Sequence, residues 1–138
     1  MARILVVDDE RAITDFVADA LSDEGYTVTV CHDGASALLE VHREAPDVVL
    51  LDIGLPVMSG DLVLRQLRAD GFTTLPIIVA SAGTHLDQFL ALGATAILRK
   101  PFGLERLIDL VAVYTSGEQA QGLERSIVQP PLPSSTGD

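Results

Sequence analysis

Three acidic residues follow a short apolar run near the start of the chain. The run covers residues 4–7 (ILVV), and Asp8, Asp9 and Glu10 come directly after it. Neighbouring carboxylates repel one another, and the repulsion grows where the end of a strand lowers the local dielectric constant. We therefore expect a positive group beside them, either a bound cation or a basic side chain from another part of the chain.

Three further residues that could bind a ligand follow later apolar runs in the same way. Asp52 and Ser81 come directly after their runs, and Lys100 comes shortly after its own. Carboxylate and hydroxyl oxygens without a neighbouring histidine or cysteine favour Mg²⁺ over zinc. If the chain folds so that these residues meet, they could hold Mg²⁺, and Lys100 would supply a second positive charge.

Five short apolar runs predict the strands that position these residues. They are residues 4–7, 27–31, 48–51, 77–80 and 95–98. The first, third and fourth are uninterrupted, as in strands that are buried on both faces of a sheet. The second alternates, with Val28 and Val30 on one face, and the fifth is weakly apolar, so both are predicted at the edges of the sheet.

Apolar residues at helical spacing fill the intervals between these strands. The first helix is predicted around residues 13–21, with Ile13, Phe16, Val17, Ala20 and Leu21 on one face. The others are predicted from Asp33 or Gly34 to about Arg43, around 63–67, from a Thr84 cap to about 90, and around 104–111. Gly25, Gly71 and Gly93 are predicted to end the first, third and fourth helices.

The alternation of strands and helices predicts an α/β fold with helices on both faces of a parallel sheet. Five strands favour the flavodoxin-like, doubly wound order 2-1-3-4-5. The carboxyl ends of parallel strands lie at one edge of the sheet, so Asp8, Asp9, Asp52, Ser81 and Lys100 should converge there. A single Asp at a strand end is usually a helix cap or a turn residue, but capping does not explain all five residues together.

The composition predicts one folded domain and narrows its partners. The chain has 138 residues, with nine basic residues against twenty acidic ones and a formal net charge of −11. It has no cluster of Lys and Arg, which argues against binding to nucleic acid or to anionic membranes. Cys31 is the only cysteine, so an internal disulfide and a cysteine-based zinc site are excluded. The chain shows no signal peptide and no apolar segment near the ~20 residues of a membrane span, which favours a cytoplasmic protein.

The last part of the chain has a different composition. Residues 117–138 are rich in Gly, Gln and Ser and end in QPPLPSSTGD. Such a segment cannot bury enough apolar surface to form a core of its own. We predict a folded domain over residues 1–116 and a polar, Pro-rich tail or linker over residues 117–138.

Several motifs together resemble the receiver domain of two-component response regulators, and of the chemotaxis regulators among them. They are ILVVDDE, PDVVLLDIGLPVMSG, IIVASA, LGATAIL and RKPF, and the resemblance covers about residues 2–115. The resemblance implies that Asp52 accepts a phosphoryl group. It implies that Mg²⁺ is bound by Asp9, Asp52 and the backbone carbonyl of Gly54, with Asp8 acting through a metal-bound water.

The resemblance also assigns roles to other residues around Asp52. Lys100 would pair with the phosphoryl oxygens, and Ser81 would donate a hydrogen bond to one of them as the switch hydroxyl. Ala82 would leave room for the phosphoryl group, and Lys100–Pro101 is expected to be a cis peptide bond. A carboxylate is a workable nucleophile toward phosphorus when a metal ion and an ammonium group neutralise the accumulating charge.

The implied function is a phosphorylation-activated signalling switch rather than an enzyme with a substrate of its own. The donor would be a phosphohistidine on a histidine kinase or on a histidine phosphotransfer protein. The output would pass to a downstream protein partner or to an output domain outside this chain. None of the three histidines, His32, His42 and His85, is expected at the site, and all three are interpreted as surface residues.

The chain departs from the family at two places. Ile97 stands where the family often has an aromatic switch residue, and only eighteen residues separate Ser81 from Lys100. The second departure removes roughly one helical turn. We therefore predict a shortened fourth helix of roughly 6–9 residues, with Leu86, Phe89 and Leu90 packed on the sheet.

Three other functions fit the sequence less well than the signalling switch. A Mg²⁺-dependent phosphohydrolase with an aspartyl-phosphate intermediate, as in the haloacid dehalogenase type, needs a second Asp two residues after the nucleophile to protonate the leaving group. That position is Gly54 here. A receiver used only as a docking module would not need the complete set of acidic residues. A flavin or nucleotide carrier is disfavoured because no Gly-rich phosphate loop follows the first strand.

Overall fold

The computed structural model describes the backbone of residues 1–124 and the side chains of residues 1–115. Its elements, in chain order, are β1 (Arg3–Val7), α1 (Arg11–Asp23), β2 (Thr27–Cys31), α2 (Gly34–Arg43), β3 (Val48–Asp52), α3 (Gly60–Ala69), β4 (Ile77–Ser81), α4 (Asp87–Ala91), β5 (Ala96–Arg99) and α5 (Leu104–Glu124). Within the described part of the chain, no helix is long and apolar enough to cross a membrane.

The five strands form one parallel sheet in the order β2-β1-β3-β4-β5. This confirms the predicted strand order and places β2 and β5 at the edges. All residues of β3 and β4 are buried, whereas four of the five β2 residues are partly or fully exposed. The uninterrupted apolar runs therefore lie in the centre of the sheet, and the alternating run lies at one edge, as expected.

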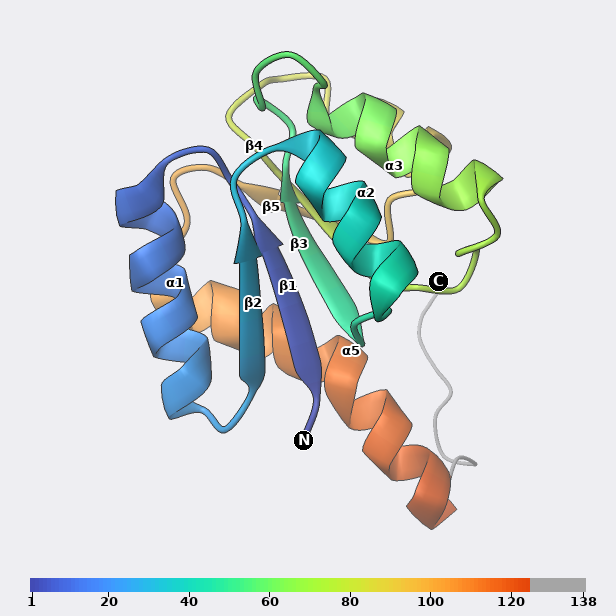
Figure 1. Cartoon of the computed structure of the whole chain (residues 1–138). Helices are drawn as coiled ribbons and strands as arrows, with labels where there is room; N and C mark the ends of the chain where they lie inside the picture. Colours follow the sequence, from blue (N-terminus) through green and yellow to red (C-terminus); the bar gives the residue numbers. More distant parts are fainter. Residues whose placement is uncertain (125–138) are drawn as a thin grey trace.

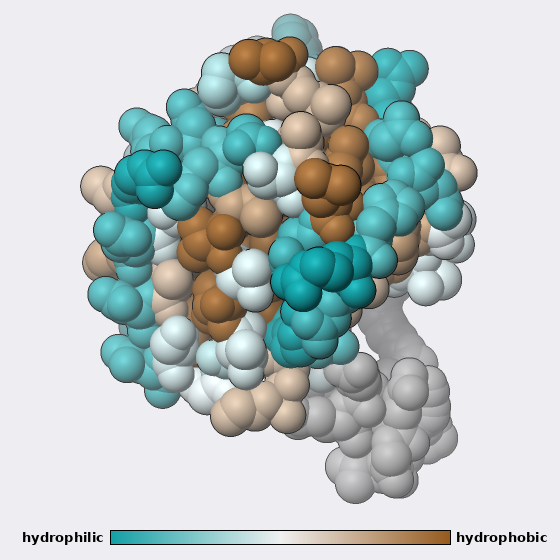
Figure 2. Space-filling model, viewed as in Figure 1, coloured by the Kyte–Doolittle hydropathy of each residue, from teal (hydrophilic) through white to brown (hydrophobic). Residues whose placement is uncertain are grey.

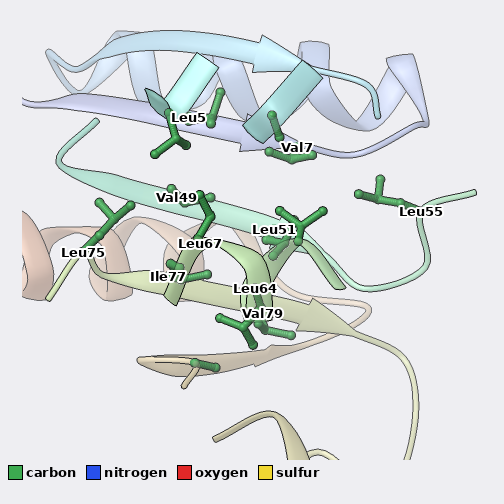
Figure 3. Packing of buried hydrophobic residues seen from close by; sticks show 14 of the residues in the cluster. Leu5, Val7, Val49, Leu51, Leu55, Leu64, Leu67, Leu75, Ile77 and Val79 are labelled. Carbon is green, nitrogen blue, oxygen red and sulfur yellow. The ribbon is translucent and has the colours of Figure 1, made fainter. Parts of the chain in front are cut away.

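Two hydrophobic clusters cover the two faces of the sheet. Along β1, Leu5 and Val7 belong to the cluster under α2, α3 and α4, while Ile4 and Val6 belong to the cluster under α1 and α5. Successive side chains of a strand point to opposite faces, which is why β1 contributes to both clusters. Figure 1 shows α2 and α3 on one face of the sheet and α5 on the other, and Figure 3 shows the packing of the first cluster.

The helix boundaries follow the predicted signals at most ends. Asp33 caps α2 through its side chain, which accepts a hydrogen bond from the Ser36 backbone N–H. Gly25, Gly71 and Gly93 follow α1, α3 and α4, and all three have positive φ angles. Glycine adopts this conformation without the steric penalty of a Cβ atom, so it ends a helix readily.

The apolar face of α1 differs from the prediction at one position. Phe16 is 59% exposed, and Thr14 is buried beside Val17 and Leu21 instead. The Thr14 hydroxyl donates a hydrogen bond to the Arg11 carbonyl, which allows a polar side chain to be buried there.

The fourth helix is shortened, as predicted, but its predicted start, its length of roughly 6–9 residues and the burial of Leu90 are wrong. The helix begins at Asp87 and has five residues, with Leu86 rather than Thr84 at its N-terminal cap. Leu86 and Phe89 are buried, but Leu90 is 49% exposed. Two buried side chains three residues apart need only about one helical turn, so the loop before the helix is longer than predicted.

Helix α5 extends to Glu124, beyond the predicted start of the tail at residue 117. Residues 125–138 lie outside the described residues. The boundary at residue 116 and the nature of the segment after it remain predictions.

Candidate functional site

The candidate site lies at the carboxyl ends of the parallel strands. Asp8 directly follows β1, Asp52 ends β3, Ser81 ends β4, and Lys100 directly follows β5. Because β1, β3, β4 and β5 are neighbours in register, these four residues meet at one edge of the sheet. The convergence predicted from the sequence is present in the structure.

Three carboxylates form the acidic part of the site. One oxygen each from Asp8, Asp9 and Asp52 lies within 4.8 Å of the other two. Asp8 and Asp52 are only 5% and 7% exposed, and Asp9 is exposed. A set of closely spaced carboxylate oxygens, without histidine or cysteine, fits Mg²⁺, which prefers a few carboxylates together with water and phosphate oxygens.

Lys100 supplies the positive charge that the acidic residues require. Its Nζ lies 3.0 Å from Asp52 Oδ1 and 3.3 Å from Asp8 Oδ2. Burial alone would lower the pKa of Lys100, but hydrogen bonds and charge interactions with Asp52 and Asp8 outweigh burial, so its pKa is raised above the ordinary value. The side chain is therefore an ammonium ion at neutral pH.

The backbone around Lys100 holds it against the neighbouring strand. Its N–H donates a hydrogen bond of 2.9 Å to the Ser81 carbonyl. The Lys100–Pro101 peptide bond is cis, which confirms the prediction made from the family resemblance.

The hydrogen bonds to Asp52 from the described residues all reach one of its two oxygens. Among the described residues, both donors to this carboxylate, Lys100 Nζ and the Gly54 backbone N–H, contact Oδ1, at 3.0 and 3.3 Å. A Cβ atom at Gly54 would lie at similar distances from both oxygens, 3.8 Å from Oδ2 and 3.9 Å from Oδ1. One oxygen is thus held in position by two donors, and the other has no donor among the described residues.

Ser81 is buried at the same edge with its hydroxyl hydrogen available. Its Oγ accepts a hydrogen bond of 3.1 Å from the Gly83 backbone N–H, which orients the hydroxyl. Ala82, between the two, is exposed and lines the cleft. This cleft has a volume of about 450 Å³ and is lined by Asp9, Glu10, Asp52, Ile53, Gly54, Ser81, Ala82, Gly83 and Lys100.

The loop after Asp52 packs tightly against the strand that carries it. A Cβ atom at Gly60 would overlap the Asp52 carbonyl and the Ile53 Cα, so only glycine fits at this position. The Gly60 N–H donates a hydrogen bond of 3.0 Å to the Ile53 carbonyl and closes the loop. Gly60 therefore helps to fix the backbone that positions Asp52.

Sequence reasoning missed two features of the site region. The Gly83 N–H that orients Ser81 could have been suggested by a glycine two residues after a strand-end hydroxyl. Val57, in the loop between β3 and α3, has a φ angle of +64°, which no pattern in the sequence indicates. Of the histidines, His42 and His85 are exposed as predicted, whereas His32 is half-buried and hydrogen-bonded to Thr14.

Known proteins with related sequences match most of the folded part of the chain. The family model described as the response regulator receiver domain matches residues 4–112. The response regulator MprA of Mycobacterium ulcerans is 43% identical over 109 residues, which cover 77% of this chain and 47% of the relative. The chain thus spans about half the length of the curated relatives it matches.

Solved structures of receiver domains are also similar. The receiver domain of Francisella response regulator 1452 has a TM-score of 0.81 and 28% identity, and the match covers 86% of this chain and 99% of that one. The chemotaxis response regulator CheY4 of Vibrio cholerae has a TM-score of 0.77 and 33% identity, over 83% of this chain and 98% of its own. From the matched sequence, the strand order and the acidic cleft beside a lysine, the chain belongs to the response regulator receiver domain family.

Proposed function

We propose that this chain is a phosphorylation-activated switch in a two-component phosphorelay, and that Asp52 accepts the phosphoryl group from a phosphohistidine. The observation that carries the proposal is the environment of Asp52. Its carboxylate is 7% exposed, lies beside two other carboxylates, and is held on one oxygen by Lys100. A buried carboxylate with a fixed ammonium partner and a free oxygen is arranged for attack on phosphorus.

The transfer can be written with the residues of the cleft. Asp52 Oδ2 forms a bond to phosphorus while the N–P bond of the phosphohistidine breaks and the imidazole leaves with the electron pair. Lys100 contacts Oδ1 and is placed to pair with the phosphoryl oxygens as charge moves onto the acceptor. The Ser81 hydroxyl, which accepts from Gly83, keeps its own hydrogen to donate to one of those oxygens.

The same cleft would hold the metal ion. Asp9, Asp52 and the backbone carbonyl of Gly54 are the proposed Mg²⁺ ligands, and Asp8 is proposed to act through a metal-bound water. When bound, Mg²⁺ would supply positive charge that balances the acidic residues and the phosphoryl oxygens. The oxygen-only donor set supports this choice of metal.

A histidine kinase or a histidine phosphotransfer protein is the proposed donor, and we place both proteins in the cytoplasm. A downstream protein, or an output domain outside this chain, would read the phosphorylated state. The receiver family supports a regulatory role rather than an independent enzyme. A phosphohydrolase is less well supported because Gly54 stands where such an enzyme needs its acid.

Labelling with acetyl phosphate tests the acceptor without requiring the natural donor. Wild-type protein should incorporate one phosphoryl group when Mg²⁺ is present and none when the metal is chelated. Asp52→Asn keeps the shape of the side chain but removes the nucleophile, so it should not be labelled. Undiminished labelling of Asp52→Asn would refute the assignment.

Phosphotransfer from a panel of autophosphorylated histidine kinases would identify the donor. The kinase whose radiolabel passes fastest to the wild-type chain is the candidate partner, and Asp52→Asn serves as the matched control. If acetyl phosphate labels the chain but no phosphohistidine protein transfers its phosphoryl group to it, the proposed place in a phosphorelay is contradicted.

A further inference from the structure

A second pocket lies beside β5, which is an edge strand of the sheet. It has a volume of about 560 Å³ and is lined by residues around α4, β5 and the start of α5: Leu86, Asp87, Leu90, Ile97, Leu98, Arg99, Pro101, Phe102, Gly103 and Arg106. None of these residues lines the acceptor cleft. The pocket is therefore a separate site, and its volume is typical of pockets that bind small ligands.

The wall of this pocket is largely apolar. Leu86 and Leu98 are buried, Ile97 and Phe102 are half-buried, and Leu90 is 49% exposed. The helix that carries Leu90 has only five residues, so it covers little of the sheet beside it. An apolar group in the pocket would remove exposed surface of Leu90 and Ile97 from water, which is favourable.

Exposed apolar side chains on α2 and α3 are isolated by comparison. Leu39 and Leu62 are 73% and 49% exposed, and they lie on different helices. On the face of the molecule seen in Figure 2, small hydrophobic groups are interspersed with hydrophilic side chains. Single exposed apolar side chains are common on folded proteins and do not indicate a ligand. Leu90 differs because it lines a pocket together with Leu86 and Ile97.

Two arginines give the pocket its charge. Arg99 and Arg106 both line it and are exposed. Within the described part of the chain, neither of them forms an ion pair with a carboxylate. Asp87 is the acidic residue of the lining, so the pocket carries one more positive than negative charge. Such a surplus stands out in a chain with nine basic residues against twenty acidic ones.

We propose that this pocket binds a small organic phosphate, in which an apolar ring carries the phosphate group. Guanidinium groups present planar sets of donors that match phosphate oxygens, and two of them suit a phosphate dianion. The ring would lie against Leu90 and Ile97 while Arg99 and Arg106 contact the phosphate. Acidic residues elsewhere on the chain repel such an anion only weakly, because salt screens charges beyond about 8 Å at physiological ionic strength.

This binding goes beyond the proposed phosphorelay, because neither Asp52 nor its cleft takes part in it. A ligand that contacts α4, β5 and the start of α5 together would hold the short α4 against the sheet. The chain would then respond to a second input, which does not depend on phosphorylation. Nucleoside monophosphates and aryl phosphates share the required chemistry, so both are used as probes.

Isothermal titration calorimetry with phenyl phosphate and with AMP tests the proposal. A chelator in the buffer keeps Mg²⁺ out of the acceptor cleft, whose carboxylates then repel the probes. At least one of the two probes should bind, and the tighter of them identifies the preferred ring. Inorganic phosphate, phenol and adenosine each carry one half of the ligand and should bind at least about tenfold more weakly.

Substitutions locate the binding in the pocket. Arg99→Gln and Arg106→Gln should each raise Kd by about three- to tenfold, as expected for the loss of one charged hydrogen-bond donor. Arg65→Gln removes the same charge from an exposed position on α3, outside the pocket, and should bind as the wild type does. Ile97→Phe narrows the pocket and should also raise Kd, whereas Asp52→Asn should leave it unchanged.

Several results would overturn the proposal. They are the absence of binding of both probes to the wild type at millimolar concentration, an unchanged Kd in both Arg99→Gln and Arg106→Gln, and an equal loss in Arg65→Gln. A hexaglutamate peptide that bound more tightly than both probes would also overturn it and would assign the pocket to an acidic protein partner. Normal binding of a probe by a chain that is not phosphorylated on Asp52 would support the pocket and refute only the proposed function.

Discussion

Lys100 is the residue on which neutralisation of the acidic cleft depends when no metal is bound. It is the one basic side chain that contacts Asp8 or Asp52 within the described residues. Both carboxylates are buried, so neither can rely on water to screen its charge. Their repulsion is the physical reason for two of the predictions below.

Removing the ammonium group should destabilise the metal-free protein. We expect Lys100→Met to lower the free energy of unfolding by about 2 kcal/mol, because two buried carboxylates lose a charged hydrogen-bond donor. Since the pKa of Lys100 is raised above 10.5, this contribution is complete below pH 10.5 and is lost only as the pH rises through the higher pKa of the folded state. Urea unfolding of both proteins at neutral pH and above pH 10.5 measures the difference, which should shrink at the alkaline pH. If the wild type and Lys100→Met were equally stable at neutral pH, Lys100 would not be needed to neutralise the buried carboxylates.

Mg²⁺ should raise the melting temperature of the wild-type chain. A ligand that binds only the folded state stabilises it by about 1.4 kcal/mol at ten times its Kd. Asp9→Asn should raise Tm in metal-free buffer, because it removes one of three repelling carboxylates, and should reduce the response to Mg²⁺. Differential scanning calorimetry with chelator or with millimolar Mg²⁺ makes the comparison. A wild-type Tm that does not respond to Mg²⁺ would argue against a metal site.

The polar and charged residues of the site could be predicted from the sequence because each lies at or just after the end of an apolar run. Asp8, Asp52, Ser81 and Lys100 need only the strand order to be brought together. Val57 and the Gly83 N–H could not be predicted in the same way, because their positions depend on loop conformation. Loop backbone angles are set by closure between packed elements, and short-range residue preferences do not determine them.

Among the elements, α4 is the least supported by its own sequence. It has five residues and no side-chain hydrogen bond at its N-terminal cap. Leu86 and Phe89 are its buried anchors, and the residues from Ala82 to His85 are exposed. A single turn with few buried contacts opens more readily than the rest of a domain. The length of this helix was overestimated from the sequence because Leu90 was counted as a core residue.

Hydrogen exchange should identify residues 82–93 as a segment of low local stability. We expect amides of this segment to exchange faster than those of β1 and β3, since the segment has fewer buried contacts. Addition of Mg²⁺ and beryllofluoride, a mimic of the phosphoryl group, should slow the exchange by drawing the Ser81 hydroxyl toward the bound group. Protection equal to that of β1 and β3, with no response to the mimic, would contradict this expectation.

The C-terminal end of α4 is fixed by Arg68 of α3. Its guanidinium donates to the Gly93 carbonyl from Nε at 2.9 Å and from Nη2 at 2.7 Å, and to the Leu75 carbonyl from Nη1 at 2.7 Å. Burial lowers the pKa of Arg68, and among the described residues no carboxylate pairs with it. The side chain donates to backbone carbonyls that have no other donor among the described residues.

Substitution of Arg68 should therefore destabilise the fold without touching the cleft. Arg68→Met leaves the carbonyls of Gly93 and Leu75 without their donor, and we expect a loss of about 2–3 kcal/mol. In Arg68→Lys, the ammonium group can bond only some of these carbonyls, so its stability should lie between those of the wild type and Arg68→Met. Urea unfolding gives the stabilities, and labelling by acetyl phosphate at low temperature checks that the cleft remains intact. A loss below about 0.5 kcal/mol in Arg68→Met would show that water replaces the guanidinium.

At the scale of the whole molecule, the sheet order followed from the sequence because hydrophobicity differs between central and edge strands. Uninterrupted runs such as 48–51 need cover on both faces, whereas the alternating run 27–31 needs cover on one. The C-terminal end of α5 could not be predicted from the sequence, because residues 117–124 have the composition of a tail but continue the helix. Helical backbone bonds can extend from a packed helix into a segment that has no apolar face of its own.

At the scale of the whole molecule, the proposed switch requires that the phosphoryl group is carried on Asp52. Peptide mapping by mass spectrometry, after incubation with acetyl phosphate and Mg²⁺, tests this claim most directly. We predict one phosphoryl group, on the peptide that contains Asp52, in a bond that hydroxylamine cleaves as it cleaves acyl phosphates. A phosphoryl group on another residue, or the same modification when Mg²⁺ is chelated, would contradict it.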